Sequence, residues 1–289
     1  MPSATPSESA APSASQRPSE ARIALVGIGT VSVMQITREA EAALRAASTF
    51  YVLHAQSLVL DYLRSEYEAE VIDLTPAYEE KKQRDETYRQ VAQAVVAGAS
   101  EGRGRRVAYV TSGHPLVLVT PSQLILRSAR EVDIPVDIVP GVSSLDTVWA
   151  DLRFDPGRQG VLMFEATSLL LRRYPLIPTV PLFLWQINSL ETSLYSTRKN
   201  RPERFTGMKK YLLEYYPADH VAYLVHSASF PITRAEVVNV TVGELEELAD
   251  VATSQHILYI PPVREQEIAD GDLLARVTSQ EHLAQLTEA

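Results

Sequence analysis

The sequence contains no cysteine, which excludes disulfide bonds, thiol catalysis and cysteine-ligated zinc sites together. It has no apolar run near the roughly 18 residues that a membrane-spanning helix needs, so a membrane partner is not expected. Basic residues are also few, since 27 Lys and Arg stand against 36 Asp and Glu for a net charge of -9. Such a surface disfavours polyphosphates, so nucleic acid is a poor candidate partner.

Large apolar side chains are nearly missing from residues 1–21, which are rich in Ser, Ala and Pro. Such a segment buries too little apolar surface to offset its ordering entropy, and it is predicted to be a disordered tail. Its start also lacks the basic and apolar regions of a signal peptide, so the expected location is cytoplasmic.

Short apolar runs alternate with helical periodicities through the first half of the chain, which indicates an α/β fold with a mostly parallel sheet. Strands are predicted at 23–26, 50–53, 71–74, 107–110 and 134–139. Helices are predicted at 37–47, 58–64 and 121–130, with another that starts near 83 and ends in the Gly- and charge-rich stretch 98–104. The second half has candidate strands at 161–164, 182–185, 221–225, 237–242 and 256–260, and helices at 207–215, 242–248 and 266–289. The predicted domains are an N-terminal half (22–139), a C-terminal half (140–262) and a helical tail (263–289).

The first predicted strand runs into Gly27-Ile28-Gly29-Thr30. A dinucleotide-binding motif would place its third glycine at position 32, where Ser32 stands, so this signal is weak. A glycine turn after a first strand lets the backbone approach a ligand closely, because no Cβ intervenes. A purely structural tight turn explains these residues equally well.

Two further strands end in small-residue loops, one at Gly113-His114-Pro115 and one at Pro140-Gly141-Val142-Ser143-Ser144. In open α/β sheets, ligands bind beyond the carboxyl ends of strands. The two loops and the turn at Gly27 line one crevice if their strands are neighbours. For Gly113-His114-Pro115, an ordinary β-turn is the alternative, with His114 bonded to the local backbone.

Arg84 and Tyr88 lie four residues apart at the start of a predicted helix, so they share one helical face. The polar sequence around them also fits the solvated first turn of an ordinary helix. The spacing alone leaves both interpretations open.

As an ordered set, the glycine turn, the Gly-His-Pro loop and the Pro-Gly-Val-Ser loop resemble the S-adenosylmethionine-dependent methyltransferases of the tetrapyrrole-methylase fold over residues 22–262. Other features resemble one branch, the borosin-type peptide backbone α-N-methyltransferases. They are Gly-His-Pro in place of Gly-Asp-Pro, VTPSQ at 119–123, WADLRFDP at 149–156, FEAT at 164–167 and Trp185-Gln186. Arg84 and Tyr88 match a pair that looks catalytic in that branch.

The resemblance implies two α/β halves with S-adenosylmethionine in the cleft between them, and a homodimer. It implies catalytic roles for Arg84, Tyr88 and Tyr78. Backbone groups from Gly113 to Leu118 are expected to approach the methionine part of the cofactor, with Ser143, Ser144 and Gln186 as polar contacts and Ala166 and Pro231 lining the adenine. The full set of implied cofactor-binding residues is Gly27, Gly29, Gly113, His114, Pro115, Val117, Leu118, Ser143, Ser144, Ala166, Gln186 and Pro231.

The sequence departs from that branch at two positions. Ser112 stands where a tyrosine usually precedes Gly-His-Pro, and Thr75 stands where a tyrosine is expected before the Arg/Tyr helix, although Tyr78 remains. Fused members of the branch carry an apolar substrate peptide at their own C-terminus, whereas residues 275–289 here, ARVTSQEHLAQLTEA, are polar. A separate precursor peptide is therefore the predicted substrate.

Methylating a backbone amide requires removal of its N–H proton, because the nitrogen lone pair is delocalised into the carbonyl. A phenol near a guanidinium serves as a base, since the positive charge favours phenolate. The guanidinium then stabilises the negative charge that moves to oxygen. Tyr88 is thus the candidate base and Arg84 the stabiliser, with no metal required.

Two other functions remain open from the sequence. A small-molecule methylase of the tetrapyrrole or precorrin type shares the fold but needs no amide-deprotonating pair. A non-catalytic S-adenosylmethionine-binding subunit is favoured by the changes at Ser112 and Thr75.

Overall fold

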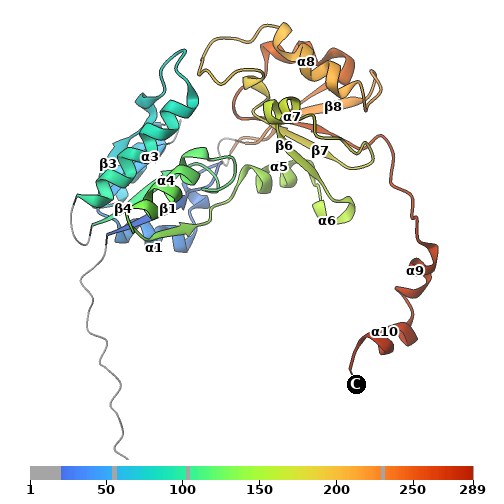
Figure 1. The fold of residues 1–289 in the computed structure, drawn as a ribbon, viewed down its shortest axis with the longest axis horizontal. Coiled ribbons are helices and arrows are strands. Elements are labelled where there is room, and N and C mark those ends of the chain that lie inside the picture. Colours follow the sequence, from blue (N-terminus) through green and yellow to red (C-terminus); the bar gives the residue numbers. More distant parts are fainter. Residues whose placement is uncertain (1–20, 54–56, 102–104, 229–231, 289) are drawn as a thin grey trace, which may run out of the picture. The chain divides into compact units, whose positions relative to one another are not determined.

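The computed structural model describes residues 21–53, 57–101, 105–228 and 232–288. The predicted tail lies outside these ranges except for Ala21. The chain forms two compact units, each built on a five-stranded sheet (Figure 1). The first unit holds the described chain up to Thr147 together with Ser193–Thr197, and the second holds Val148–Thr192, Arg198–Ala228 and the chain from Thr233 onward. The predicted α/β class with two sheets is confirmed.

Every strand pair in the first sheet is parallel, in the order β3-β2-β4-β1-β5. The strands are β1 (Arg22–Gly27), β2 (Thr49–Leu53), β3 (Glu70–Asp73), β4 (Arg106–Thr111) and β5 (Val136–Val139). Because β1 pairs with both β4 and β5, the three strands that end in glycine-containing turns are neighbours. The prediction of a parallel first sheet is confirmed.

Helices cover both faces of the first sheet. The helical segments are η1 (Val33–Gln35), α1 (Arg38–Ala46), α2 (Ser57–Glu66), η2 (Thr75–Ala77), α3 (Arg84–Ser100), α4 (Thr120–Glu131) and α5 (Ser144–Leu152), which crosses into the second unit. The core with α1 and α2 contains Leu44 and Leu63, and the core with α3 and α4 contains Val95 and Ile125.

The third helix ends at Ser100, within the predicted stretch 98–104, and Gly98 lies inside it. A Cβ on Gly98 would collide with the Tyr51 hydroxyl, so the glycine makes room for that ring inside a continuous helix. Here a glycine marks close packing instead of a helix end.

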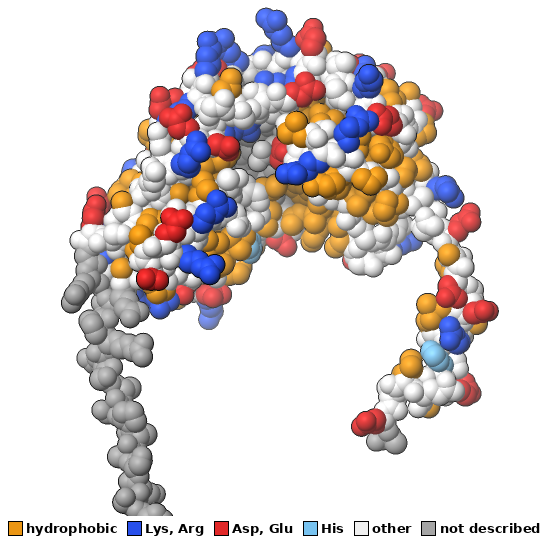
Figure 2. All heavy atoms as spheres, in the orientation of Figure 1, with side chains coloured by type: hydrophobic (Ala, Val, Ile, Leu, Met, Phe, Trp, Pro, Cys, Tyr) orange, Lys and Arg blue, Asp and Glu red, His pale blue; other side chains and the backbone are white. Residues whose placement is uncertain are grey.

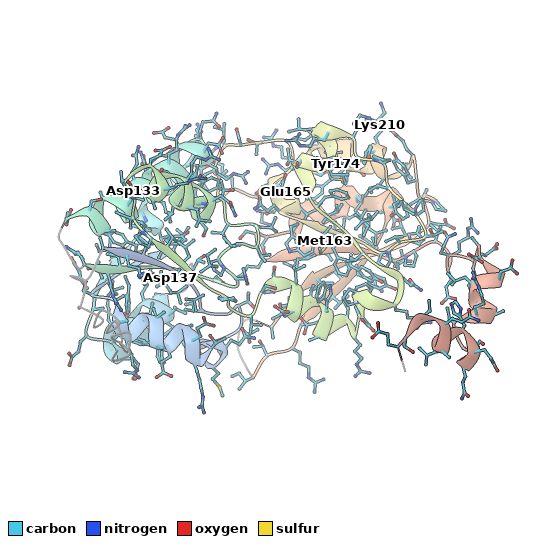
Figure 3. The ribbon with its side chains drawn as sticks, turned by 60° about the horizontal axis from the view of Figure 1, so that its bottom comes forward. Asp133, Asp137, Met163, Glu165, Tyr174 and Lys210 are labelled. Atoms are coloured by element: carbon cyan, nitrogen blue, oxygen red, sulfur yellow. The ribbon has the colours of Figure 1, made fainter. Side chains whose placement is uncertain are left out.

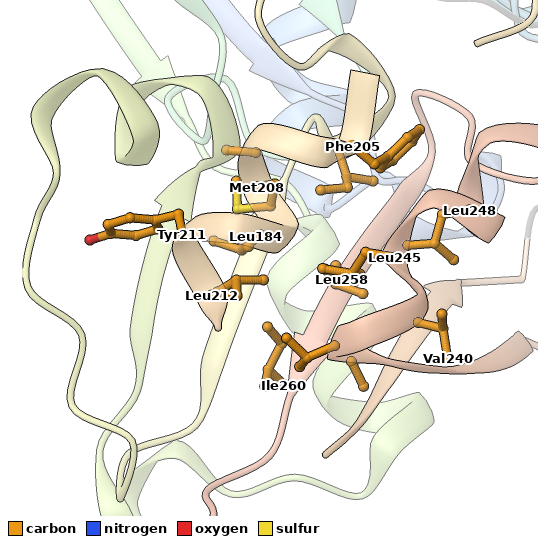
Figure 4. Packing of buried hydrophobic residues seen from close by; sticks show 14 of the residues in the cluster. Leu184, Phe205, Met208, Tyr211, Leu212, Val240, Leu245, Leu248, Leu258 and Ile260 are labelled. Atoms are coloured by element: carbon orange, nitrogen blue, oxygen red, sulfur yellow. The ribbon is translucent and has the colours of Figure 1, made fainter. Parts of the chain in front are cut away.

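The second sheet has the order β6-β7-β10-β8-β9, with β6 and β7 parallel and the other pairs antiparallel. Its strands are β6 (Leu162–Glu165), β7 (Leu182–Trp185), β8 (Val221–His226), β9 (Glu236–Thr241) and β10 (His256–Ile260). One face is covered by α7 (Ala166–Arg172), α8 (Glu203–Leu212) and η4 (Val242–Asp250), around buried Leu184, Phe205, Met208, Leu245 and Leu258 (Figure 4).

The other face of the second sheet carries a line of aromatic rings. The distances between ring centroids are 5.2 Å for Phe154 and Phe183, 4.8 Å for Phe183 and Tyr259, and 5.9 Å for Tyr259 and Tyr223. Hydrophobic side chains also reach the surface of this unit (Figure 2), including Met163 and Tyr174, labelled in Figure 3, which are 43% and 40% exposed.

The remaining segments are α6 (Pro156–Gln159), η3 (Ile187–Ser189), α9 (Gly271–Arg276) and α10 (Gln280–Leu286). The prediction of one helix over 266–289 is wrong, because Ser279 accepts the His282 N–H at 3.2 Å and begins a second helix. The helix predicted at 242–248 is a 3₁₀ helix. Across the part of the chain that the structure describes, no helix combines the length and apolarity needed to cross a bilayer.

Candidate functional site

The turns that follow β1, β4 and β5 meet at Gly27, Gly113 and Gly141. A Cβ on Gly27 would collide with the Gly113 carbonyl oxygen and lie 2.9 Å from the Gly141 nitrogen. A Cβ on Gly141 would lie 2.6 Å from the Gly27 carbonyl carbon. Only glycine permits this approach, and we call the three residues the glycine junction. Their convergence follows from the parallel sheet, whose carboxyl ends share one edge.

Gln35 holds the turn after β1 in place. Its Oε1 accepts the N–H groups of Thr30 and Val31 at 2.8 and 2.9 Å. Gly29 has φ +83°, and the Gly113 N–H donates to its carbonyl at 2.9 Å. Nothing in the sequence pattern singles out Gln35, because its role depends on how η1 folds back over the turn.

The Gly113-His114-Pro115 segment forms a tight turn, with Gly113 at φ +71°. His114 Nδ1 accepts the Leu116 N–H at 3.0 Å, which is the local bond considered as the alternative role of this residue. With Nδ1 as acceptor, Nε2 carries the proton of a neutral ring and remains a donor. Leu118 also has a positive φ of +58° and is 43% exposed. Ser112, at the position of the expected tyrosine, is exposed and donates to the Gly29 carbonyl at 3.4 Å.

Ser143 lies just before α5 (Ser144–Leu152), a helix that is not among those predicted from the sequence. The Ser143 hydroxyl and N–H both donate to Asp146 Oδ2 at 2.7 Å, and the hydroxyl accepts the Leu145 N–H at 3.2 Å. The hydroxyl is therefore committed to the first turn of α5, which begins at Ser144. The Ser-x-x-Asp spacing at 143–146 was the available signal, since it resembles a capping box.

In the second unit, Ala166 and Gln186 follow the carboxyl ends of neighbouring parallel strands. Glu165 on β6 pairs with Trp185 on β7, so the next residue of each strand is at the same level. Ala166 is fully buried at the start of α7, and Gln186 has φ +58°. Pro231, also expected near the cofactor, lies outside the described residues.

Tyrosine rings gather around the start of α3 in the first unit. The Tyr78 ring lies 6.3 Å from Tyr88 and 5.1 Å from Tyr195, with edge-on geometry in both pairs. Arg84 is the first residue of α3 and lies one turn before Tyr88 on the same face. The structure thus brings Tyr78 and Tyr88 together beside Arg84. Tyr195 is remote in the chain, and no local pattern in the sequence connects it with this cluster.

Tyr78 and, on β4, Tyr109 hold their protons strongly. Burial raises the pKa of Tyr78 above its usual range, negative charge on Tyr88 and Tyr195 raises it further, and the Arg84 guanidinium lowers it. Burial likewise raises the pKa of Tyr109, which is fully buried on β4. Near neutral pH, Tyr78 is therefore a hydrogen-bond donor and not a base.

Lys82 ties the loop that carries Tyr78 to α3. Its side chain is only 10% exposed, and its Nζ donates to the Ala77 carbonyl (3.1 Å), Glu79 Oε1 (2.8 Å) and Gln90 Oε1 (2.7 Å). These three acceptors satisfy the three N–H donors of an ammonium group. The sequence shows Lys82 only as one charge in a polar segment, because its inward orientation depends on the fold of the loop.

The buried tyrosines predict a loss of stability in alkaline solution. Burial raises the pKa of Tyr109 and raises that of Tyr216, which is 3% exposed, to about 12. Above about pH 10 the unfolded chain loses these protons while the native chain keeps them. The free energy of unfolding is then expected to fall by about 1.4 kcal/mol per pH unit for each such tyrosine. Urea unfolding at a series of pH values between neutrality and pH 11 measures this slope.

The matched variants are Tyr109→Phe and Tyr174→Phe. The Tyr109 hydroxyl is buried without a hydrogen-bond partner among the described residues, so its removal is tolerated at neutral pH and flattens the alkaline slope. Tyr174 is 40% exposed, so its replacement leaves the slope unchanged. Equal slopes in the wild type and Tyr109→Phe would contradict the prediction.

Comparison with known proteins adds to this geometry. Residues 22–246 match the family model of the tetrapyrrole (corrin/porphyrin) methylases. The chain belongs to this family. The match includes both sheets apart from β10 (His256–Ile260), together with the glycine junction and the tyrosine cluster.

The chain is also similar to fungal proteins whose names combine a methyltransferase with a peptide precursor. It is 29% identical over 273 residues to the "methyltransferase/ribosomally synthesized type I borosin cyclic peptide precursor" of Serendipita vermifera subsp. bescii, covering 91% of this chain and 64% of that protein. It is 30% identical over 259 residues to the corresponding type III protein of Anomoporia bombycina, covering 87% of this chain and 30% of that protein. The chain thus spans less than two thirds of the length of these relatives.

Solved structures show the same fold. Uroporphyrin-III-C-methyltransferase from Thermus thermophilus aligns with a TM-score of 0.58 at 20% identity, over 84% of this chain and 93% of that one. The methyltransferase CobJ aligns with a TM-score of 0.62 at 15% identity, over 86% of this chain and 98% of that one. Another structure of the Thermus thermophilus enzyme, described as complexed with S-adenosylhomocysteine, aligns with a TM-score of 0.56 at 18% identity, over 83% and 97%.

Proposed function

We propose that this chain is an S-adenosylmethionine-dependent methyltransferase that acts on backbone amides of a ribosomal precursor peptide. The observation that carries the proposal is the cluster at the start of α3, where Tyr78 and Tyr88 lie edge to face beside Arg84. A methylase acting on an activated carbon has no need of a phenol and guanidinium pair. The names of the fungal relatives, which join a methyltransferase to a peptide precursor, support the same class.

The glycine junction fits the cofactor. Backbone atoms of Gly27, Gly113 and Gly141 come so close that any side chain at Gly27 or Gly141 would fill the space between the turns. Glycine turns without Cβ atoms at the carboxyl ends of strands suit a ligand that binds along those strand ends. The family assignment and the neighbour described with S-adenosylhomocysteine support S-adenosylmethionine as this ligand. When bound, it supplies an electrophilic sulfonium methyl group.

The chain's own residues perform the proton chemistry. Tyr88, on the same helical face as Arg84, takes the amide proton as its phenolate, which the nearby guanidinium favours, and becomes a neutral phenol. The Arg84 guanidinium stays charged and faces the carbonyl oxygen on which negative charge develops. Tyr78 stays protonated because burial raises its pKa, so it donates a hydrogen bond to the site instead of competing as a base.

The peptide is proposed to be supplied as a separate chain, so that it can be added to the purified protein. The test incubates the purified protein with S-adenosylmethionine and short peptides encoded beside the gene, followed by intact-mass analysis. Mass increments of one methyl group, placed on backbone nitrogens by fragmentation, are the expected result. Methylation of a tetrapyrrole with no change in any peptide would refute the peptide function and favour a small-molecule methylase.

A further inference from the structure

The segment Ser193–Thr197, which we call the strap, is a short piece of the first unit that interrupts the sequence of the second unit. Its neighbours on both sides, Val148–Thr192 and Arg198–Ala228, belong to the second unit, whereas the strap itself belongs to the first. It pairs there with the segment before α3 through an antiparallel bridge between Gln83 and Leu194. A piece of chain more than 100 residues away in sequence is therefore built into the tyrosine cluster.

Backbone bonds set the register of the strap. The Lys81 N–H donates to the Tyr195 carbonyl at 2.8 Å, and the Tyr195 N–H donates to the Lys82 carbonyl at 2.9 Å. The Arg84 N–H donates to the Ser193 carbonyl at 2.9 Å. This last bond satisfies a first-turn donor of α3, whose N-cap residue Gln83 makes no side-chain capping bond.

Side chains reinforce the pairing on both sides of Tyr195. The Ser193 hydroxyl donates to Gln83 Oε1 at 2.6 Å, and the Ser196 hydroxyl donates to Glu80 Oε1 at 2.7 Å. The Thr197 N–H donates to Glu80 Oε2 at 3.0 Å. With its flanking residues anchored, Tyr195 is held at a defined place against Tyr78.

We propose that Tyr195 is a further positioning residue of the site, acting through Tyr78. The centroids of the Tyr195 and Tyr78 rings are 5.1 Å apart in an edge-on contact, whereas those of Tyr78 and Tyr88 are 6.3 Å apart. Tyr78 is therefore in contact with one aromatic ring from the strap and one from α3. Lys82 fixes the backbone before Tyr78 through the Ala77 carbonyl, while Tyr195 limits where the Tyr78 ring points. The inference rests on the proposed function, in which Tyr78 donates a hydrogen bond to the site.

The variants are Tyr195→Leu, which removes the ring, and Tyr195→Phe, which keeps it. We expect Tyr195→Leu to lower kcat for the peptide roughly 2- to 12-fold with little change in KM, as an aromatic pair contributes about 0.5–1.5 kcal/mol. Tyr195→Phe is expected to retain wild-type kcat. Tyr62→Leu is the matched control, because Tyr62 is also half-buried and makes an edge-on contact, with Tyr67 at 6.4 Å, in the other core of the first unit.

A second measurement needs no peptide. Tyrosine labelled with ¹³C at Cζ gives one NMR signal per residue, and the Tyr78 signal is identified by its loss in Tyr78→Phe. We expect this signal to move in Tyr195→Leu and to stay in place in Tyr62→Leu. Tyr195→Met serves as a second ring-free variant if Tyr195→Leu does not fold.

An unmoved Tyr78 signal in the ring-free variant, or an unchanged kcat, would overturn the proposal. So would a raised KM at constant kcat, which would make Tyr195 a substrate contact. If the wild-type protein methylates no peptide, the proposed function fails, while the NMR comparison still decides whether Tyr195 orients Tyr78.

Discussion

The Tyr88→Phe variant is expected to lose peptide methylation by a factor on the order of 10² to 10⁴ while its fold persists. General base catalysis contributes about this much, and phenylalanine keeps the ring that contacts Tyr78 while removing the group that accepts the proton. The loss is expected in kcat, because the Tyr88 hydroxyl acts on the proton during the reaction. Initial rates by intact-mass analysis at saturating peptide and S-adenosylmethionine measure it.

The control for this variant is Tyr62→Phe. Tyr62 lies on α2 and packs against the core on the opposite face of the first sheet, away from α3. Its loss of a hydroxyl is expected to leave kcat unchanged. Circular dichroism and cofactor titration verify that Tyr88→Phe is folded and binds S-adenosylmethionine. A folded Tyr88→Phe variant with wild-type kcat would remove Tyr88 from the mechanism and leave the base unassigned.

The Gly27→Ala variant is expected to lower the free energy of unfolding by about 1–3 kcal/mol, the usual cost of one extra methyl group in a closed space. Its Cβ would collide with the Gly113 carbonyl oxygen and lie 2.8 Å from Pro115 Cδ and 2.9 Å from the Gly141 nitrogen. Two of these three atoms belong to backbone, so relief requires the turns after β4 and β5 to move apart. Urea unfolding measures the loss, and calorimetric titration is expected to show weakened S-adenosylmethionine binding.

Gly271→Ala is the matched control for Gly27→Ala. A Cβ at Gly271 meets no atom within 4 Å, and the residue opens the exposed helix α9. This variant is expected to change the free energy of unfolding by no more than about 0.5 kcal/mol. Its affinity for the cofactor is expected to stay the same. If Gly27→Ala unfolds at the wild-type urea concentration and binds the cofactor normally, the glycine junction has room that the structure does not show.

Much of the first unit is readable from the sequence because its signals are local. Apolar runs that end in Gly27, Gly113 and Gly141 predict strands with glycine turns, and helices between strands predict parallel pairing. Parallel pairing then places the three turns at one edge of the sheet. The Arg84 and Tyr88 spacing likewise survives, because α3 begins at Arg84 and keeps both on one face.

Local signals are incomplete where a residue's role depends on its neighbours in space. Gly98 lies at the predicted end of α3, and only the structure shows that it makes room for Tyr51. The Ser143 hydroxyl donates to Asp146 just before α5, which only the structure shows. The contact of Ser143 with the cofactor stays a prediction.

By itself, the sequence determined the α/β class, the parallel first sheet, the position of the glycine turns and the Arg84/Tyr88 face. These depend on backbone preferences and on periodicities of a few residues. Only the tertiary structure decided that Lys82 points inward, that Tyr109 lies buried beneath the sheet surface, and that Tyr195 lies against Tyr78. The reason is physical, because such contacts join segments up to 117 residues apart and form only when the chain has folded.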